Sequence, residues 1–440
     1  MKGLFMQSKL NYRRTFFIGL AFLSISAFWQ MYDNIIPLIL QNTFGLKETV
    51  TGTVMAADNV LAVVLLPLFG TLSDKVDTRF GKRIPFIVCG TILAVIFMMM
   101  LPTADRAGNL VWFVIALFLT LLSMGLYRSP AVALMPDLTP NKLRSKANAV
   151  INLMGAVGGV YTLIMIMILV GEGTTPDYTP LFISVAALMI IAVGILVVTI
   201  RENALKKKLA GLIAGSEEKQ EAEAETKAEG AGAKTVLKPE VKRSLYFMLA
   251  SIFFWFTAYN AVTTAFSRYT MVVWKLEGGG FANCLMVATV AAILSYIPIG
   301  NIASKIGRKK TIMGGVLLMA ACYGAAMFVD SYHPVINVAF ALIGVAWAAI
   351  NVNSYPMIVA MSKGADIGKF TGTYYTFSMA AQIVTPILSG VLLENISYRT
   401  LFPYALIFSL LAFLTMTQVK HGDVKPGKKA SALENFDVED

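Results

Sequence analysis

About twelve long apolar segments, separated by clusters of charged residues, run through this 440-residue chain. A helix needs about 20 mostly apolar residues to cross the hydrocarbon core of a bilayer. Only 14% of the residues are charged, well below the share of about a quarter in soluble domains. We therefore expect an all-α membrane protein. The expected helices are 15–41, 49–72, 84–102, 109–135, 147–170, 178–200, 244–272, 281–303, 311–329, 334–360, 369–392 and 399–418.

The basic residues fall mainly in every second loop. One set of loops holds Lys2, Lys9, Arg13, Arg14, Lys75, Arg79, Lys82, Arg83, Lys142, Arg144, Lys146, Lys305, Arg308, Lys309, Lys310, Lys363 and Lys369. The opposite set holds only Lys47, Arg106, Arg268, Lys275 and Arg399. This asymmetry predicts cytoplasmic N and C termini in a cell inner membrane, and it explains the net charge of +11 without nucleic acid. The first segment is too long for a cleaved signal peptide and should be retained.

The polar region 201–243 divides the chain into two parts with six helices each. Its Glu, Lys, Ala and Gly content cannot form a buried core, so we expect a cytoplasmic linker that is partly helical. The expected organisation is one helical bundle over 1–200, the linker, a second bundle over 244–418, and a cytoplasmic tail over 419–440.

The two halves repeat each other in detail, as is common in secondary transporters. The string LPLFGTLSDKVDTRFGKR follows the second helix, and IPIGNIASKIGRKK follows the eighth. Pro130, near the end of the fourth helix, corresponds to Pro356 in the tenth. These matches, at an offset of about 226 to 230 residues, predict two pseudo-symmetric six-helix bundles.

The first of these strings contains G-x-L-S-D-K-x-x-T-R-x-G-K-R over 70–83, which resembles the loop signature of the major facilitator superfamily. The second half holds a shorter copy over 300–310. Gly70 permits a close helix approach, and Asp74 lies where it can pair with basic groups. The resemblance implies that the loop latches one state of an alternating-access cycle. Its candidate gating residues are Gly70, Asp74, Lys75, Arg79, Gly81, Lys82 and Arg83, with Gly300, Lys305, Gly307 and Arg308 in the second half.

Within this superfamily, the first half is similar to the sucrose/proton symporters and to the glycoside-cation symporters. The likeness rests on GTLSDKVDTRFGKRIPFI and on ALMPDLTPNKLRSKANAVINLMGAVGG after the fourth helix. In the plant sucrose carriers an arginine lies five residues before the aspartate of that helix, whereas this chain has Val132 there and Arg128 one turn earlier. The resemblance therefore implies a sugar or glycoside but does not assign sucrose.

Among the charged residues of the expected spans, three stand out: Asp33, Asp58 and Arg128. Such charges cost about 2.5 to 3.5 kcal/mol on insertion scales, so they are retained mostly where they face a cavity or a partner. Asp33 and Asp58 lie at similar depth and could share one polar pocket. Because burial favours a protonated carboxyl and a nearby cation favours a charged one, either aspartate suits proton coupling. A structural pair or an aspartate at the membrane interface is the alternative, and Arg128 fits a substrate, gating or structural role.

Aromatic and amide side chains at helical spacing fit a sugar site, in which rings stack on the sugar and amides bind its oxygens. Lipid-facing or core packing is the alternative for each pair. The candidate substrate residues are Trp29, Asp33, Arg128, Tyr259, Asn260, Trp347, Asn351, Tyr375 and Gln382.

The sequence favours a proton-coupled symporter of a sugar or glycoside. Sodium is the less favoured coupling ion, because a sodium site gathers several oxygen ligands and only two clear carboxylates lie in the spans. An exporter of amphipathic compounds and a solute sensor that does not transport remain alternatives. Cys89, Cys284 and Cys322 are far apart, and the chain has only two histidines. No metal-ligand spacing or nucleophile–base pair is visible, so we expect no metal, no cofactor and no enzyme activity. The bilayer and the solute are the expected partners of a monomer.

Overall fold

The computed structural model describes residues 10–140, 143–173, 175–213, 238–362 and 367–423. Within these residues the chain forms twelve long helices and the short helices α8 (Glu202–Ile213) and η2 (Tyr398–Thr400). The first half contains α2 (Tyr12–Asn42), α3 (Glu48–Lys75), α4 (Ile84–Arg106), α5 (Leu110–Asp137), α6 (Arg144–Leu169) and α7 (Thr179–Thr199). The second half contains α10 (Pro239–Val273), α11 (Phe281–Ile306), α12 (Arg308–Ala326), α13 (Ile336–Val359), α14 (Ile367–Asn395) and α15 (Leu401–Thr417).

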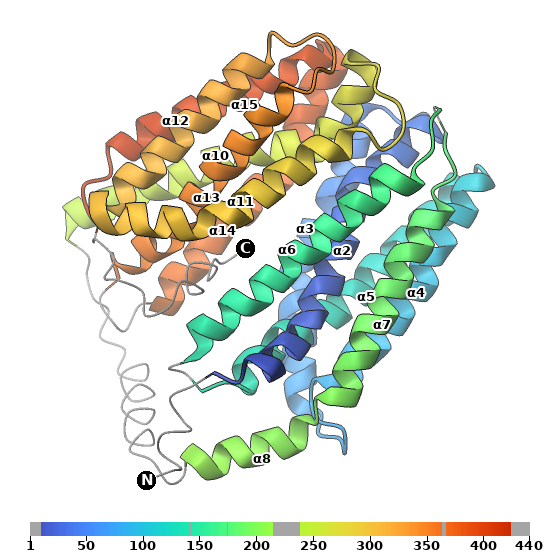
Figure 1. The fold of residues 1–440 in the computed structure, drawn as a ribbon, viewed down its shortest axis with the longest axis vertical. Coiled ribbons are helices and arrows are strands. Elements are labelled where there is room, and N and C mark those ends of the chain that lie inside the picture. The colour runs from blue at the N-terminus through green and yellow to red at the C-terminus, as the bar shows by residue number, and fades with distance from the viewer. Residues whose placement is uncertain (1–9, 141–142, 174, 214–237, 363–366, 424–440) are drawn as a thin grey trace.

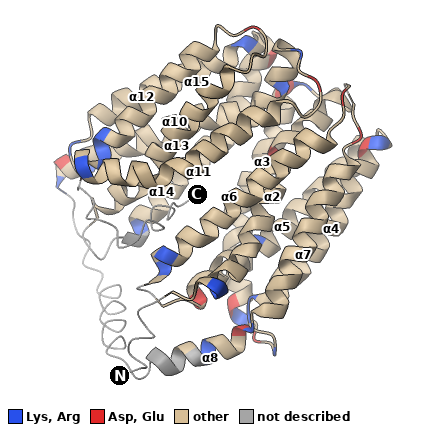
Figure 2. Cartoon of the chain, in the orientation of Figure 1, with Lys and Arg blue, Asp and Glu red and all other residues tan. Residues whose placement is uncertain are grey.

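The long helices agree with the twelve expected segments to within a few residues. Eleven helices in the described part are long and apolar enough to cross a membrane. The remaining helix, α12, is only 19 residues long and begins with three basic residues. Figure 2 shows that the charged residues gather mostly at the ends of the helices. The fold is therefore that of a multi-pass membrane protein.

The two halves lie side by side, and they approach each other at one end of the long helices (Figure 1). We call this the Glu48 end, because α3 begins there. The opposite end is the Arg83 end, where α3 stops and α4 starts. Contacts between the halves are made by α3 with α14, by α6 with α11, and by α2 with α10.

Within each half, glycines allow helices to pack at backbone distance. A Cβ atom on Gly158 of α6 would lie 2.0 Å from the carbonyl oxygen of Leu23 in α2. A Cβ atom on Gly344 of α13 would lie equally close to the carbonyl oxygen of Ala288 in α11. Because neither position accepts a larger residue without movement, α2 packs closely on α6 and α11 packs closely on α13.

The expected linker begins with a helix, α8, which leaves the first half at the Arg83 end (Figure 1). The rest of the expected linker up to residue 237, and the end of the expected tail from 424, lie outside the described residues. The Lys2, Lys9, Lys142 and Lys363 positions of the charge pattern also lie outside them.

Candidate functional site

A cavity of about 840 Å³ lies between the two halves. It begins among residues near the middle of the helices and reaches toward the Arg83 end, where Pro136, Arg144 and Asn148 contribute to its lining. Its volume lies within the range of about 300 to 1,000 Å³ that small-molecule pockets occupy. The cavity is therefore large enough for a small solute.

The charged wall of the cavity comes from the first half and contains Asp33 of α2, Asp58 of α3 and Arg128 of α5. Asn59 donates to one carboxylate oxygen of Asp58 from its backbone nitrogen at 2.6 Å and from its side chain at 2.7 Å. The Arg128 guanidinium lies 5.8 Å from the ring centre of Trp29, within the range of a cation–π contact. Two carboxylates and a cation thus share one wall.

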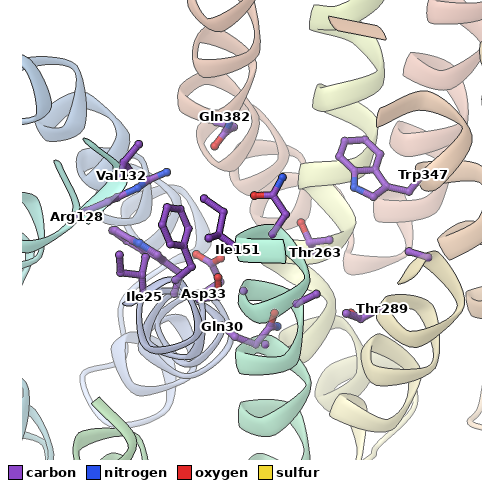
Figure 3. A pocket seen from close by; sticks show the side chains of 18 of the residues that line it. Ile25, Gln30, Asp33, Arg128, Val132, Ile151, Thr263, Thr289, Trp347 and Gln382 are labelled. Atoms are coloured by element: carbon purple, nitrogen blue, oxygen red, sulfur yellow. The ribbon is translucent and has the colours of Figure 1, made fainter. Parts of the chain in front are cut away.

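The neutral wall comes from α10, α11, α13 and α14 of the second half and carries rings, amides and hydroxyls. Tyr259 and Trp347 stack with ring centres 3.8 Å apart and an interplanar angle of 3°. Phe256 packs edge-on against Trp347 and holds its ring in place. Figure 3 shows Trp347 and Thr289 across the cavity from Asp33 and Arg128. Such a wall can stack on a flat apolar face and bind hydroxyl groups.

The cavity brings together most of the substrate residues proposed from the sequence. Those that line it are Trp29, Asp33, Arg128, Tyr259, Asn260, Trp347, Tyr375 and Gln382, and the coupling candidate Asp58 lines it as well. Val132, the position that departs from the plant carriers, also lines the cavity. Asn351 is different: it is buried within α13 and is not part of the lining, although it lies one turn from Trp347.

Sequence reasoning missed several polar lining residues. They are Gln30, Asn59, Asn148, Asn152, Thr263, Thr264, Thr289 and Tyr296. Asn59 and Gln30 could have been found from their place in apolar helices beside the proposed site, because an amide in a span needs a partner. The threonines carried no such signal, since a threonine hydroxyl can bond to its own helix backbone, as Thr289 does with Leu285.

The loop at the Arg83 end is held by ion pairs within the first half. The Arg83 guanidinium contacts Asp74 at 2.5 Å and Asp137 at 2.9 Å, and its side chain is only 8% exposed. It also donates to the Gly70 carbonyl oxygen at 3.4 Å. Arg83 therefore joins the end of α3 to the end of α5.

The other gating candidates lie around these contacts. Gly81 and Gly307 both have positive φ values, 118° and 96°, which favour glycine and support the repeat. Arg308 donates to the carbonyl oxygen of Pro356 at 3.4 Å, and Arg79 lies over the ring of Phe80. Lys75 and Lys305 are exposed near the ends of α3 and α11, and Gly300 lies one turn earlier in α11.

Glu202 of α8 is a buried partner of this loop that the sequence did not reveal. Its carboxylate accepts from the backbone nitrogens of Lys82, Arg83 and Ile84 at 3.0, 2.9 and 3.1 Å. These are nitrogens at the start of α4, where a negative charge is favourable. In the second half, Asp423 accepts from the Lys309 backbone nitrogen at the start of α12. Each half thus caps its loop with a carboxylate that follows its last long helix.

Comparison with known proteins agrees with this architecture. A sucrose transport protein of Arabidopsis thaliana is 25% identical over 151 residues, which cover 30% of this chain and 25% of that protein. YagG of Escherichia coli, whose glycoside/cation symport is a provisional assignment, is 32% identical over 92 residues, covering 21% of this chain and 19% of that protein. The chain thus matches about a quarter or less of the length of these relatives.

Solved structures are similar over nearly the whole chain. The xylose transporter of E. coli in an inward-open conformation aligns with a TM-score of 0.66 and 15% identity, covering 96% of this chain and 98% of that one. The nucleoside transporter NupG aligns with the same TM-score and 14% identity, covering 92% and 100%. At such identities the likeness concerns the fold. The family described as MFS/sugar transport protein matches residues 17–405, so the chain belongs to this family of membrane transporters.

Proposed function

We propose that the chain is a proton-coupled symporter of a sugar or glycoside that works by alternating access. The observation that carries this proposal is the cavity itself, in which a charged wall with Asp33 and Asp58 faces a neutral wall with the Tyr259–Trp347 ring pair. A sugar placed between them would meet rings and amides on one side and titratable groups on the other.

The proton is the favoured coupling ion, and sodium is the alternative. Hard cations are usually held by several oxygen ligands at once. Of the two wall carboxylates, Asp58 already accepts two hydrogen bonds from Asn59 at one oxygen. Arg128 also lies near enough to Asp58 to interact with it electrostatically. Donors already bound to one oxygen and a nearby cation leave this carboxylate less able to coordinate a metal ion, so we favour the proton.

The orientation that we propose follows from the basic residues. The Arg83 end carries the larger share of lysine and arginine, so the positive-inside rule places it in the cytoplasm. The N terminus, α8 and the segment after α15 would then be cytoplasmic, in a cell inner membrane. In this orientation the cavity is reached from the cytoplasm.

Uptake measurements test the function directly. Cells that express the chain would be given radiolabelled monosaccharides, disaccharides and aryl glycosides, with and without a protonophore and in sodium-free medium. We expect accumulation of at least one compound, abolished by the protonophore and unaffected by sodium removal. Uptake that depends on sodium would identify sodium as the coupling ion.

Two outcomes would favour the alternatives. The lining contains aromatic and apolar residues such as Phe22, Ile25 and Met55, which an exporter of amphipathic compounds could also use. Resistance to dyes without uptake of any sugar would indicate that exporter. Saturable binding of a sugar to purified protein without flux into vesicles would indicate a sensor.

A further inference from the structure

A buried ion pair joins the two halves at the Glu48 end. The Nε atom of Arg268 in α10 lies 3.0 Å from each carboxylate oxygen of Glu48 in α3. The two side chains are only 3% and 5% exposed. Tyr398 of η2 donates its hydroxyl to the same carboxylate at 2.5 Å and also lies 3.4 Å from the Gln41 side-chain oxygen. Elements from both halves therefore meet at one carboxylate.

Because the Glu48–Arg268 pair is buried, breaking it costs more free energy than breaking an exposed pair. Two charges in a buried site must compensate each other, because loss of one partner leaves the other buried without its counter-charge. An exposed ion pair can instead be replaced by water at little cost. The halves can separate at this end only if Glu48 and Arg268 part and both become hydrated.

Close backbone contacts at two glycines also hold the halves together at the Glu48 end. A Cβ atom on Gly52 of α3 would lie 2.1 Å from the carbonyl oxygen of Pro386 in α14. On the other side of the interface, a Cβ atom on Gly279 would lie 2.1 Å from the carbonyl oxygen of Ile166 at the end of α6. Any side chain larger than hydrogen at either glycine would hold the halves apart.

The pair is also connected to the cavity through its own helices. Arg268 donates to the carbonyl oxygen of Thr264, which lines the cavity one turn away. On the opposite side, α3 carries Glu48 at its start and Asp58 in the cavity wall. Movement of α3 against α10 therefore acts on both places.

We propose that Glu48, Arg268 and Tyr398 form the gate that closes the cavity at the Glu48 end, and that the Glu48–Arg268 pair must break in every transport cycle. The gate belongs to the carrier whatever its solute, so the proposal goes beyond the proposed function. It assigns a role to three residues outside the cavity and outside the loop at the Arg83 end.

A thiol-labelling experiment tests the gate. Thr289→Cys places a reporter in the cavity, with Cys89→Ser removing the exposed native thiol and the buried Cys284 and Cys322 retained. A membrane-impermeant maleimide is applied to intact cells and to inside-out vesicles. Glu48→Gln leaves Arg268 buried without a counter-charge, so the closed gate loses its stability. We expect labelling from the Glu48 side to rise at least about tenfold, and labelling from the Arg83 side to fall.

Gly52→Ala provides an independent variant, because it prevents closure by steric contact and leaves both charges in place. It should shift the labelling in the same direction. The exchanged pair Glu48→Arg with Arg268→Glu should restore much of the original pattern. Arg399→Gln is the matched control: its partner Asp330 lies in the same half, and both side chains are more than 60% exposed.

The result is decisive in either direction. A shift in Glu48→Gln that the exchanged pair reverses supports the gate, as does a shift in Gly52→Ala if Glu48→Gln fails to reach the membrane. Labelling by Glu48→Gln that remains like the parent overturns the proposal, as does unchanged labelling by Gly52→Ala where Glu48→Gln fails to reach the membrane. An equal shift in Arg399→Gln would overturn it too, since any lost charge at that end would then suffice.

Discussion

The two walls of the cavity differ in charge, and this difference bears on the role that we propose for each. The charged wall keeps Asp33, Asp58 and Arg128 inside a membrane-spanning bundle, where each charge is costly. Across the cavity, the neutral wall contributes rings, amides and hydroxyls. A group that exchanges a proton must be titratable, whereas a group that grips a sugar needs shape and hydrogen bonds. We therefore propose that coupling resides in the first half and much of the solute binding in the second.

This division has a mechanical consequence. Because the walls belong to different halves, a solute held between them would contact both parts that move in the proposed alternating-access cycle. The protonation state of the charged wall can then affect how readily the halves close on the solute. Variants on the two walls should accordingly change different measured quantities.

The greatest change is expected for Asp58→Asn, which keeps the shape and the contact with Asn59 but removes the titratable proton. A pH gradient of one unit supports up to about tenfold accumulation of a solute carried with one proton. The whole factor should be lost, while exchange of labelled for unlabelled solute continues. Uptake and counterflow assays in proteoliposomes measure both. Full accumulation by this variant and by Asp33→Asn would remove both carboxylates from the coupling step.

Asp33→Asn should combine two effects, because Asp33 lies one turn from Trp29 on the same wall. We expect loss of accumulation together with a half-saturating concentration raised about threefold or more. Asp58→Asn should change the half-saturating concentration less. Parallel concentration series of counterflow for the two variants separate affinity from coupling. Equal effects of the two variants on affinity would mean that Asp33 and Asp58 do not differ in their contribution to solute binding.

Trp347→Ala addresses the neutral wall. Loss of the ring should raise the half-saturating concentration about threefold to tenfold, the range expected for one aromatic contact. The accumulation ratio at saturating solute should remain, since no titratable group is removed. Trp347→Phe keeps a ring and is the matched control. A lost accumulation ratio with unchanged affinity would reverse the roles assigned to the two walls.

The smallest effect should come from Arg83→Gln, because Arg83 lies on neither wall. Its loss leaves Asp74 and Asp137 without their shared guanidinium, so turnover should fall about threefold. Affinity and accumulation ratio should stay close to those of the parent. Initial rates of exchange provide the measurement, with Asp77→Asn, an exposed carboxyl in the same loop, as control. Neutralising Lys82 together with Arg83 should slow turnover further without loss of membrane insertion.

Local features of the chain were sufficient to predict much of the fold. Bilayer thickness sets the length of each apolar segment, and membrane insertion sets which loops are basic. Both can therefore be predicted from one segment of the sequence at a time. The rise of a helix converts sequence position into depth, which suggested that Asp33 and Asp58 could share one pocket, and both line the cavity. The two similar loop sequences, over 70–83 and 300–310, predicted the division into two halves.

Contacts between distant segments could not be predicted in this way. Arg268 looked like one more charge at the outer end of a helix, yet it is buried against a carboxylate 220 positions away. Glu202 looked like the start of a solvated linker, yet it is fully buried against the start of α4. Hydrophobic periodicity reports only which face of a helix is apolar. It does not report which helix lies opposite.

The sequence alone thus determined the membrane class, the twelve helices, the repeat and the candidate charges, because each depends on properties of one segment in its solvent. Only the tertiary structure decided that Tyr259 stacks on Trp347, that Asn351 lies outside the cavity, and that Glu48 meets Arg268. These outcomes depend on how helices rotate and approach when the two halves pack. That arrangement depends on the side-chain volumes and charges of both helices in each contact, so it cannot be predicted from one helix alone.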